Sequence, residues 1–493
     1  MNNVHEKKPT ARVVDIFNVP TNIRFTDFGE KVYHLDNETY RLRYPILKTS
    51  DIQKIILEIK QNRLEYLSQL PISNIITIID QAITRWTDPS YPQRQLALKL
   101  LPAITDYDAE TIKLEIKRFI RLFRKKELFR FVENELPQPA ILDDFHPQKS
   151  GGMVKAFGPE ATFHVFSGNI PGLQIWSLIM TTLVKSASLG KTSFSEPLFP
   201  VLFTQTIAEI DPQLANCMAI IPWHGGTVSL ERTATEDTEA TIVYGSNKTV
   251  QSIRPLVPMS KIFLHYGYKI SFSMIGKEAL TADLYTQTIK QAVEDVAIYD
   301  QQSCLSTQAI FVENHGVITP IMVAKMIAAE LANYQTKRNR ASLTIEQSSA
   351  INRERTKYQL ENTNGVSVQV FTSTQNTDWT VVYHASPGFS SSPLNRFVHV
   401  FQIDHLEDVN QYLKPYQVYL QSCAMAVSPT RLFTLANQLG EIGINRVSAL
   451  GEITRAKPGW HHDGHFNLLD LLHFIDVEPN AEQMSEKYDP DVE

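Results

Sequence analysis

The pattern of apolar and polar residues predicts helices in the first third of the chain, after an irregular start. Apolar residues recur at helical spacing over Ile52 to Leu70, Asn74 to Trp86 and Gln93 to Leu101. Asp51 stands directly before the first of these segments and can cap it. We therefore expect residues 1–160 to form a mostly helical region that packs on the rest of the protein.

A longer helix is expected from Asp108 to Glu135, because the apolar residues of this segment share one face. That face comprises Ile112, Ile116, Phe119, Ile120 and Phe123. Much of the remaining surface is basic and comprises Lys117, Arg118, Arg121, Arg124, Lys125 and Lys126. Two interpretations stay open: a solvated helix face, or a docking surface for an acidic partner or a phosphate group.

From about Ala161 the pattern changes to short β-branched and aromatic runs that alternate with helical segments. The expected strands are Thr162 to Phe166, Met218 to Ile221, Ala240 to Tyr244 and Ile262 to His265. The expected helices are Gly172 to Val184, Leu198 to Ile210 and Lys248 to Leu256. Such alternation is typical of a parallel sheet covered by helices, and it predicts a dinucleotide-binding α/β domain over residues 161–271.

A second α/β domain is expected over residues 272–454, followed by a tail, 455–493, that packs back on the core. Its expected helices are Ala282 to Tyr299, Ile321 to Tyr334, Leu406 to Leu413 and Pro429 to Leu439. Its expected strands are Ile310 to Glu313, Val366 to Phe371, Trp379 to His384, Phe397 to Ile403 and Val418 to Ala424.

Composition narrows the function classes. The 493 residues are 43% hydrophobic and 20% charged, which suits a globular protein of two or three domains. A formal net charge of -6 gives no general attraction for nucleic-acid phosphates. No apolar stretch is long enough for a membrane span, and the polar segment Met1 to Thr10 has no apolar run behind it, so a cytoplasmic protein is expected.

The three cysteines point to one reactive thiol. Cys217, Cys304 and Cys423 are odd in number and lack the spacing of a disulfide framework or a zinc site, so no metal is expected. Cys304 lies in a polar loop between an expected helix and an expected strand, where a substrate can reach it. Cys217 lies inside an apolar run, which is typical of a packing cysteine.

A family resemblance gives Cys304 a role. The string Asp300-Gln301-Gln302-Ser303-Cys304, with Asp295-Val296-Ala297 before it and Ser306-Thr307-Gln308 after it, resembles the active-site segment of LuxC-type fatty acyl-CoA reductases of bacterial bioluminescence operons. Those enzymes are distant members of the aldehyde dehydrogenase superfamily. The similarity extends from about Phe163 to Glu478, and it implies an aldehyde dehydrogenase-like fold with a Rossmann-type cofactor domain and Cys304 as the nucleophile.

The turn Phe166 to Gly172 resembles a block of the superfamily in which an asparagine amide points at the acyl oxygen. The resemblance implies that Asn169 and the backbone N–H of Cys304 stabilise the oxyanion, and that Ser167 and Gly168 contact the cofactor. A tight strand-to-helix connection would explain the same residues.

The segment Lys185 to Pro197 resembles the family's cofactor-contacting strand, and Lys191 falls on its lysine. NAD users of the superfamily often carry a Glu three residues later, where it repels a 2′-phosphate. Phe194 stands there instead, with Ser193 beside it, so NADPH is the expected cofactor. A surface lysine on a strand edge is the alternative.

Two further cofactor contacts follow from the resemblance. Gly245 and Ser246 form a small-residue turn between a strand and a helix, where backbone N–H groups can meet a phosphate. Asn395 replaces the Glu that grips the nicotinamide ribose in the superfamily, although the alignment there is loose.

His265 stands where hydrolytic aldehyde dehydrogenases have the Glu that activates water. Without that carboxylate, hydrolysis of an acyl-enzyme should be slow, which favours reduction. His265 can serve as an acid or base, or only as a polar partner at a strand end. The block Lys457 to Gly464 also recurs in the family; we interpret its His462 and Asp463 as part of a structural turn.

The resemblance thus implies NADPH-dependent reduction of a fatty acyl thioester, on CoA or on a protein, to the aldehyde through an S-acyl-Cys304 intermediate. It also implies a homo-oligomer and an acyl-protein synthetase as a partner. Three alternatives stay open: a CoA-acylating aldehyde dehydrogenase that works toward the thioester with NAD, a cofactor-free cysteine acyltransferase, and a catalytically silent scaffold that retains the fold.

Overall fold

The computed structural model describes residues 11–363 and 367–491, which form two compact units. Of the described residues, unit 1 comprises 11–104, 115–267 and 465–491, and unit 2 comprises 105–114, 268–363 and 367–464. The chain therefore leaves unit 1 twice, after residue 104 and after Gly267, and returns at Glu115 and at His465.

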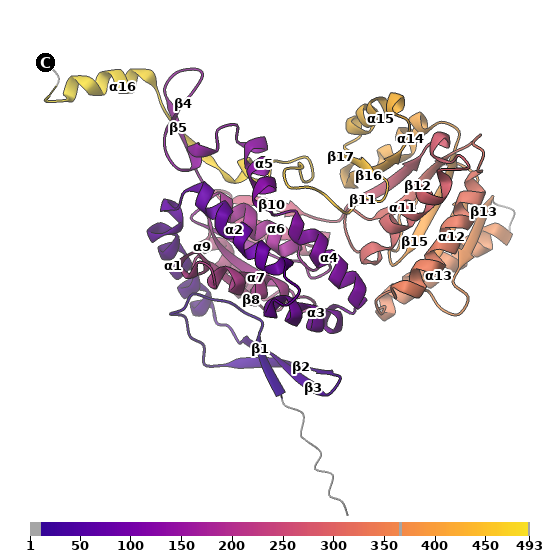
Figure 1. Cartoon of the computed structure of the whole chain (residues 1–493), viewed down its shortest axis with the longest axis horizontal. Helices are drawn as coiled ribbons and strands as arrows, with labels where there is room; N and C mark the ends of the chain where they lie inside the picture. The colour runs from indigo at the N-terminus through magenta and orange to yellow at the C-terminus, as the bar shows by residue number, and fades with distance from the viewer. Residues whose placement is uncertain (1–10, 364–366, 492–493) are drawn as a thin grey trace, which may run out of the picture. The chain divides into compact units, whose positions relative to one another are not determined.

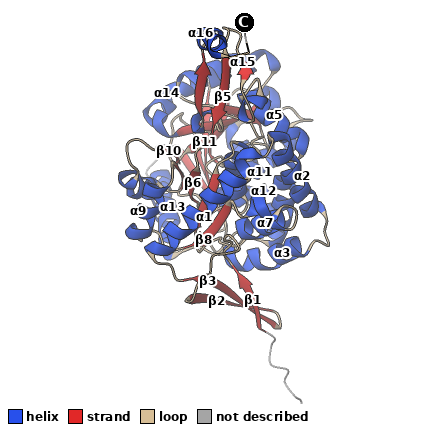
Figure 2. Cartoon of the chain, turned by 90° about the vertical axis from the view of Figure 1, so that its left-hand side faces the viewer, coloured by secondary structure: helices blue, strands red, loops and turns tan. Residues whose placement is uncertain are grey.

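Unit 1 is built around a parallel five-stranded sheet, which Figure 2 shows among its covering helices. The strand order is β10-β9-β6-β7-β8, with β6 (Ala161–Val165), β7 (Ala187–Thr192), β8 (Met218–Pro222), β9 (Ala240–Tyr244) and β10 (Ile262–Tyr266). The connecting helices are α6 (Leu173–Leu183), α7 (Phe199–Ala208), α8 (Pro212–Ala215), α9 (Val228–Asp237) and α10 (Asn247–Ile253). The four strands predicted from the pattern are confirmed to within one residue, whereas α9 was not predicted.

The helices α1 (Thr49–Glu65), α2 (Ile72–Thr87) and α3 (Pro92–Thr105) confirm the prediction of an N-terminal helical region. The α1 residues Ile52, Ile55, Ile56 and Ile59 are buried in one cluster with β6, β7, β8 and β9. Asp51 is not the N-cap of α1: it lies in the first turn and accepts the backbone N–H of Lys48 at 2.8 Å.

The prediction of an irregular start to the chain is wrong. Residues 11–45 form a three-stranded sheet of order β1-β3-β2, made of β1 (Ala11–Asp15), β2 (Phe28–Leu35) and β3 (Glu38–Pro45). Figure 1 shows these three strands together, in indigo, at the bottom of the view. Asn18 and Ile220 exchange backbone hydrogen bonds of 2.8 and 2.7 Å, which attaches the segment after β1 to β8.

The prediction of a single helix from Asp108 to Glu135 is also wrong. The segment forms two helices, α4 (Ala109–Arg121) and α5 (Lys125–Glu135). Asp80 of α2 accepts hydrogen bonds from Arg124 Nε at 2.6 Å and from the backbone N–H of Lys125 at 2.8 Å, and so caps the start of α5. A side chain more than forty positions away therefore ends a periodicity that continues in the sequence.

Unit 2 contains a seven-stranded sheet of order β13-β14-β15-β12-β11-β16-β17, in which all neighbours except β13 and β14 are parallel. The strands are β11 (Ile270–Ile275), β12 (Thr307–Glu313), β13 (Val368–Thr372), β14 (Thr380–His384), β15 (Phe397–Ile403), β16 (Leu420–Ala426) and β17 (Arg446–Ala449). The predicted strand Val366 to Phe371 begins at a residue outside the described ones.

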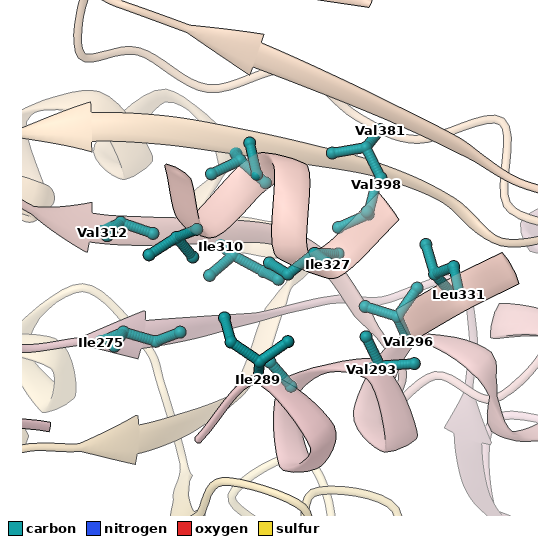
Figure 3. Packing of buried hydrophobic residues seen from close by; sticks show 14 of the residues in the cluster. Ile275, Ile289, Val293, Val296, Ile310, Val312, Ile327, Leu331, Val381 and Val398 are labelled. Carbon is teal, nitrogen blue, oxygen red and sulfur yellow. The ribbon is translucent and has the colours of Figure 1, made fainter. Parts of the chain in front are cut away.

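The helices of unit 2 are α11 (Tyr285–Ala297), α12 (Pro320–Lys337), α13 (Ile345–Thr363), α14 (Val409–Leu413) and α15 (Pro429–Glu441). Figure 3 shows Ile289, Val293 and Val296 of α11 and Ile327 and Leu331 of α12 packed against buried strand residues of the sheet. Close packing in this apolar layer holds β11, β12, β14 and β15 in place, and with them the polar loops at the strand ends.

The last segments of unit 1 are a second three-stranded sheet and a terminal helix. The sheet has the order β18-β5-β4, with β4 (His146–Pro147), β5 (Met153–Phe157) and β18 (His473–Val477), and α16 (Pro479–Ser485) follows. Of the helices within residues 11–363 and 367–491, none is both long and apolar enough to cross a bilayer.

Candidate active site and cofactor site

The predicted cofactor residues of unit 1 gather at one edge of the five-stranded sheet. Because parallel strands end at the same edge, the loops after β6, β7, β8 and β9 lie together. Ser167 and Gly168 follow β6, Ser193 follows β7, and Gly245 and Ser246 follow β9. The strand order reverses at β6, and this is where doubly wound sheets bind dinucleotides.

Lys191 is a buried cation at the end of β7. It is 7% exposed, and within the described residues its Nζ has no hydrogen-bond or ion-pair partner. Burial lowers the pKa of Lys191, while the nearby carboxylate of Glu231 acts in the opposite direction. A Cβ on Gly225 would lie 3.6 Å from this Nζ, and one on Gly226 would meet nothing within 4 Å. An ammonium without a partner beside open backbone suits an anionic ligand, so the residues present fit a dinucleotide.

Phe194 lies in an aromatic and cationic cluster. Its ring contacts Tyr44 at 4.8 Å and His224 at 4.6 Å between centroids. Lys31 of β2 lies over the same ring at 5.6 Å and donates to the Phe194 carbonyl at 3.4 Å. The unpredicted N-terminal sheet thus supplies a lysine to the Phe194 cluster.

The turn after β6 is closely packed against the loop after β7. A Cβ on Gly168 would lie 2.1 Å from Ser195 Oγ and 3.0 Å from the Glu196 backbone nitrogen, so a larger residue there would require the Ser195 side chain to move. Gln174 of α6 donates to the Ser167 carbonyl at 3.0 Å, and Ser193 and Ser195 share a hydroxyl hydrogen bond of 2.7 Å. Asn169 is exposed at the tip of this turn.

The other two predicted positions of unit 1 have plain local roles. Ser246 is the N-cap of α10 and accepts the backbone N–H of Thr249 at 3.3 Å. His265 is exposed on the edge strand β10 and lines a shallow cavity with Val250, Arg254, Lys261 and Phe263. A catalytic role for His265 stays untested.

In unit 2, the candidate residues lie at the edge where the parallel strands begin. Cys304 precedes β12, Lys269 precedes β11, and Asn395 precedes β15. Gln421 lies at the start of β16, and Arg446 begins β17. Residues that are far apart in sequence therefore surround the cysteine because their strands are neighbours in a parallel sheet.

Two triplets of left-handed residues shape the loop before Cys304. Tyr299, Asp300 and Gln301 have φ angles of 52°, 51° and 62°, and Leu394, Asn395 and Arg396 have φ angles of 64°, 60° and 62°. None of the six is glycine, and each such residue costs on the order of 1 kcal/mol. The surrounding contacts must offset that strain.

Those contacts join the two triplets directly. The Arg396 guanidinium donates to Asp300 Oδ1 at 2.7 Å, and both side chains are less than 5% exposed. The Asn395 backbone N–H donates to the Asp300 carbonyl at 2.9 Å. Gln301 accepts the Phe397 N–H at 2.8 Å and donates to the Thr307 carbonyl at 2.8 Å. The nucleophile loop is thus fixed to the start of β15.

Asn395, predicted to contact the nicotinamide ribose, belongs to this network. Its side chain is 5% exposed, and its amide oxygen accepts from Gln302 at 3.0 Å. The structure therefore brings Asn395 and the Cys304 loop together, and a cofactor contact by Asn395 stays a prediction.

Cys304 is partly exposed, whereas Cys217 and Cys423 are buried. Burial of the sulfur, and next the charge of Asp463, raise the pKa of Cys304 to about 12; a hydrogen bond from the Gln421 side chain and the charge of Lys269 oppose this rise. The Ser271 hydroxyl donates to the Cys304 carbonyl at 2.8 Å. At neutral pH the thiol is therefore protonated until a reaction removes its proton.

One group in unit 2 has the composition of a metal site. The ligand atoms of Glu313, His405 and Glu407 lie within 4.8 Å of one another. Arg431 donates to Glu313 at 2.8 Å, to Glu407 at 3.0 Å and to Glu278 at 3.2 Å, so its guanidinium bridges these carboxylates and offsets part of their charge. This cluster is explained by the ion pairs alone.

Comparison with known proteins identifies the family. The family model for acyl-CoA reductase (LuxC) matches residues 67–474. The chain belongs to this family. The predicted family, and with it the prediction of an oxidoreductase, are confirmed.

Acyl-CoA reductase (LuxC) relatives match along nearly their whole length. The long-chain acyl-protein thioester reductase of Photorhabdus luminescens is 23% identical, over 92% of this chain and 89% of its own. The reductase of the same name from Vibrio harveyi is also 23% identical, over 84% of each chain.

Solved structures share the fold. Aldehyde dehydrogenase 21 from Physcomitrella patens has a TM-score of 0.71 and 12% identity, covering 95% of this chain and 98% of its own. The NADP-dependent glyceraldehyde-3-phosphate dehydrogenase from Bacillus halodurans has a TM-score of 0.69 and 12% identity, covering 92% and 95%. The predicted aldehyde dehydrogenase-like α/β fold is confirmed.

Proposed function

We propose that the protein reduces a fatty acyl thioester, carried on CoA or on a protein, to the aldehyde with NADPH. The observation that carries the proposal is Cys304: it is the partly exposed cysteine of the chain, and it lies in the segment that resembles the family's nucleophile. The names of the relatives, long-chain acyl-protein thioester reductases, support a long-chain acyl donor.

In this proposal the Cys304 sulfur attacks the acyl carbon, and the bond from that carbon to the donor thiol breaks. The proton of Cys304 leaves with the donor thiol, and an S-acyl enzyme remains. Asn169 and the backbone N–H of Cys304 donate hydrogen bonds to the oxygen that becomes negative. A bound nicotinamide supplies the hydride that reduces the thioester carbon. The bond between that carbon and the Cys304 sulfur then breaks, the aldehyde departs, and the Cys304 thiolate takes up a proton from solvent.

Intact-mass analysis tests the acyl transfer. Incubation with long-chain acyl-CoA is expected to add one acyl group to the wild-type protein, and NADPH is expected to remove it as aldehyde appears. The variant Cys304→Ala should show neither event, while the control Cys217→Ala should behave like wild type because that residue is buried in a packing position. An acyl adduct that persists in Cys304→Ala contradicts the proposed nucleophile.

We assign the preference for NADPH to the cluster around Phe194. Lys191 and Lys31 supply positive charge there, Ser193 supplies a hydroxyl, and Phe194 stands where NAD users often carry a carboxylate. In the variant Phe194→Glu, the new carboxylate repels a 2′-phosphate. The dissociation constant for NADPH is therefore expected to rise about tenfold relative to that for NADH, which is about 1.4 kcal/mol.

Fluorescence titration of each nicotinamide measures these constants without turnover. Phe194→Leu is the matched control, because it removes the ring without adding charge. Equal NADPH-to-NADH ratios in the two variants would contradict the assignment.

A further inference from the structure

The turn that contains His462, Asp463 and Gly464 also holds a buried carboxylate. The turn is present: the Gly464 N–H donates to the His461 carbonyl at 3.1 Å, and Asp463 and Gly464 have φ angles of 54° and 82°. Its Asp463 carboxylate, however, is only 6% exposed and points to charged and polar partners at the edge where the strands of unit 2 begin. A structural turn alone does not require a buried carboxylate.

Asp463 has one partner on each of two strand starts. Lys269, before β11, lies with its Nζ 3.4 Å from Asp463 Oδ2. Gln421, in β16, donates from Nε2 to Asp463 Oδ1 at 2.5 Å. The orientation of the Gln421 amide is thereby fixed, because only its NH₂ group can donate to a carboxylate.

Gln421 connects this ion pair to the nucleophile. Its side chain is fully buried, and its hydrogen bonding lowers the pKa of Cys304. Gln421 lies in β16, the neighbour of β11, and the β11 residue Ser271 donates to the Cys304 carbonyl at 2.8 Å. The order of contacts is Lys269, Asp463, Gln421 and Cys304, drawn from four separate segments of unit 2.

The charged groups that act on the sulfur come from three elements. Asp463 raises the pKa of Cys304, and Lys269 lowers it. Arg446 of β17 also interacts electrostatically with Cys304. Burial lowers the pKa of this arginine to about 10, whereas the charges of Asp295 and Cys304 act in the opposite direction. The Arg446 guanidinium is committed to the carbonyls of Ile453 at 2.5 Å and Glu452 at 3.2 Å. Asp463 and Lys269 are thus the two charges opposed at the thiol.

We propose that Lys269, Asp463 and Gln421 are positioning residues that control how readily Cys304 reacts, with Asp463 holding the thiol in its resting form and Lys269 counteracting it through the same carboxylate. The inference rests on the proposed role of Cys304 as nucleophile. Gln421 aims a donor at the sulfur, where it stabilises the thiolate as the proton leaves. Lys269 neutralises the carboxylate that would otherwise oppose that charge.

The test is the rate at which iodoacetamide alkylates Cys304, measured by peptide mass mapping between pH 7 and 10. Asp463→Asn removes a negative charge, so the rate at a given pH should rise about threefold to tenfold, as expected for a shift of up to one pKa unit. Lys269→Met should lower the rate by a similar factor. In the double variant Lys269→Met/Asp463→Asn, the two effects should largely cancel.

This design separates electrostatics from a loss of structure. Loosening of the turn would shift both single variants in the same direction, and that result, or no shift in either, would overturn the proposal. Asp404→Asn, an exposed carboxylate of the same unit, is the control that should leave the rate unchanged. If Asp463→Asn does not fold, Lys269→Met compared with the charge-preserving Lys269→Arg gives the same answer.

Alkylation needs neither an acyl donor nor a nicotinamide. A protein that is alkylated as expected but never acylated would contradict the proposed function and leave the positioning role intact. A protein that forms the acyl adduct but shows no opposed charge effects would contradict only the positioning role.

Discussion

In the loop before Cys304, contacts of single side chains offset the strain of the left-handed backbone. Arg396 makes several of these contacts. Its guanidinium binds Asp300 Oδ1, Gln335 Oε1 at 2.5 Å and the Arg338 carbonyl at 3.1 Å. The variant Arg396→Met leaves the buried Asp300 carboxylate without its counter-charge. We expect it to lower the free energy of unfolding by about 3 to 5 kcal/mol, measured by denaturant titration.

Asp300→Asn should cost less than Arg396→Met. Burial raises the pKa of Asp300, and Arg396 only partly offsets this, so the ionised carboxylate is the more costly form to bury. Because the pKa is raised, the contribution of Asp300 to stability is present at low pH and is lost as the pH rises through its folded pKa.

Arg353→Met, which removes an exposed pair with Glu354, is the control for Arg396→Met and should change stability by less than about 1 kcal/mol. Equal losses in Arg396→Met and Arg353→Met would contradict this role.

The sequence allowed the site to be predicted only where a local motif exists. Cys304 stands in a polar loop that a short motif marks, Asn169 follows a strand that periodicity predicts, and Lys191 lies in a segment that the family resemblance marks. Lys269, Gln421 and Arg396 carry no such mark. Each is a polar residue next to a strand, and only the strand order of a parallel sheet brings it to the cysteine.

At the scale of elements, periodicity predicted the strands β6, β8, β9 and β10 of the unit 1 sheet, but it did not predict β7, β11 or the 19-residue helix α13. All five residues of β6, β8 and β9 are buried, although Thr162 and His164 of β6 and Thr241 of β9 are polar. The pattern failed where a contact between residues far apart in sequence determines the element or its boundary. Asp80 of α2 ends one helix and starts another at Lys125, and β1 pairs with β3 across a long loop, in strands with many exposed residues. Neither event has a local signature.

At the scale of the whole molecule, one buried carboxylate ties the end of the chain back to unit 1. Glu135, at the end of α5, is 3% exposed. It accepts the backbone N–H of Asn467 at 2.9 Å and of Leu468 at 2.6 Å, and the side-chain amide of Asn467 at 2.7 Å. These bonds span more than 330 positions, and β18 pairs with β5 only a few residues later.

Glu135→Gln should therefore release the C-terminal segment while the rest of the protein stays folded. Its new NH₂ group would face N–H donors, and each buried donor left without an acceptor costs about 1 to 3 kcal/mol. Limited proteolysis is expected to cut within residues 465–491 at least about tenfold faster, since a loss of 1.4 kcal/mol raises the open population tenfold. Glu133→Gln, two residues away and exposed, is the matched control and should be cut like wild type. Equal cleavage of the two variants would show that β18 and its pairing with β5 hold the segment without Glu135, because that pairing is the other attachment that the fold provides.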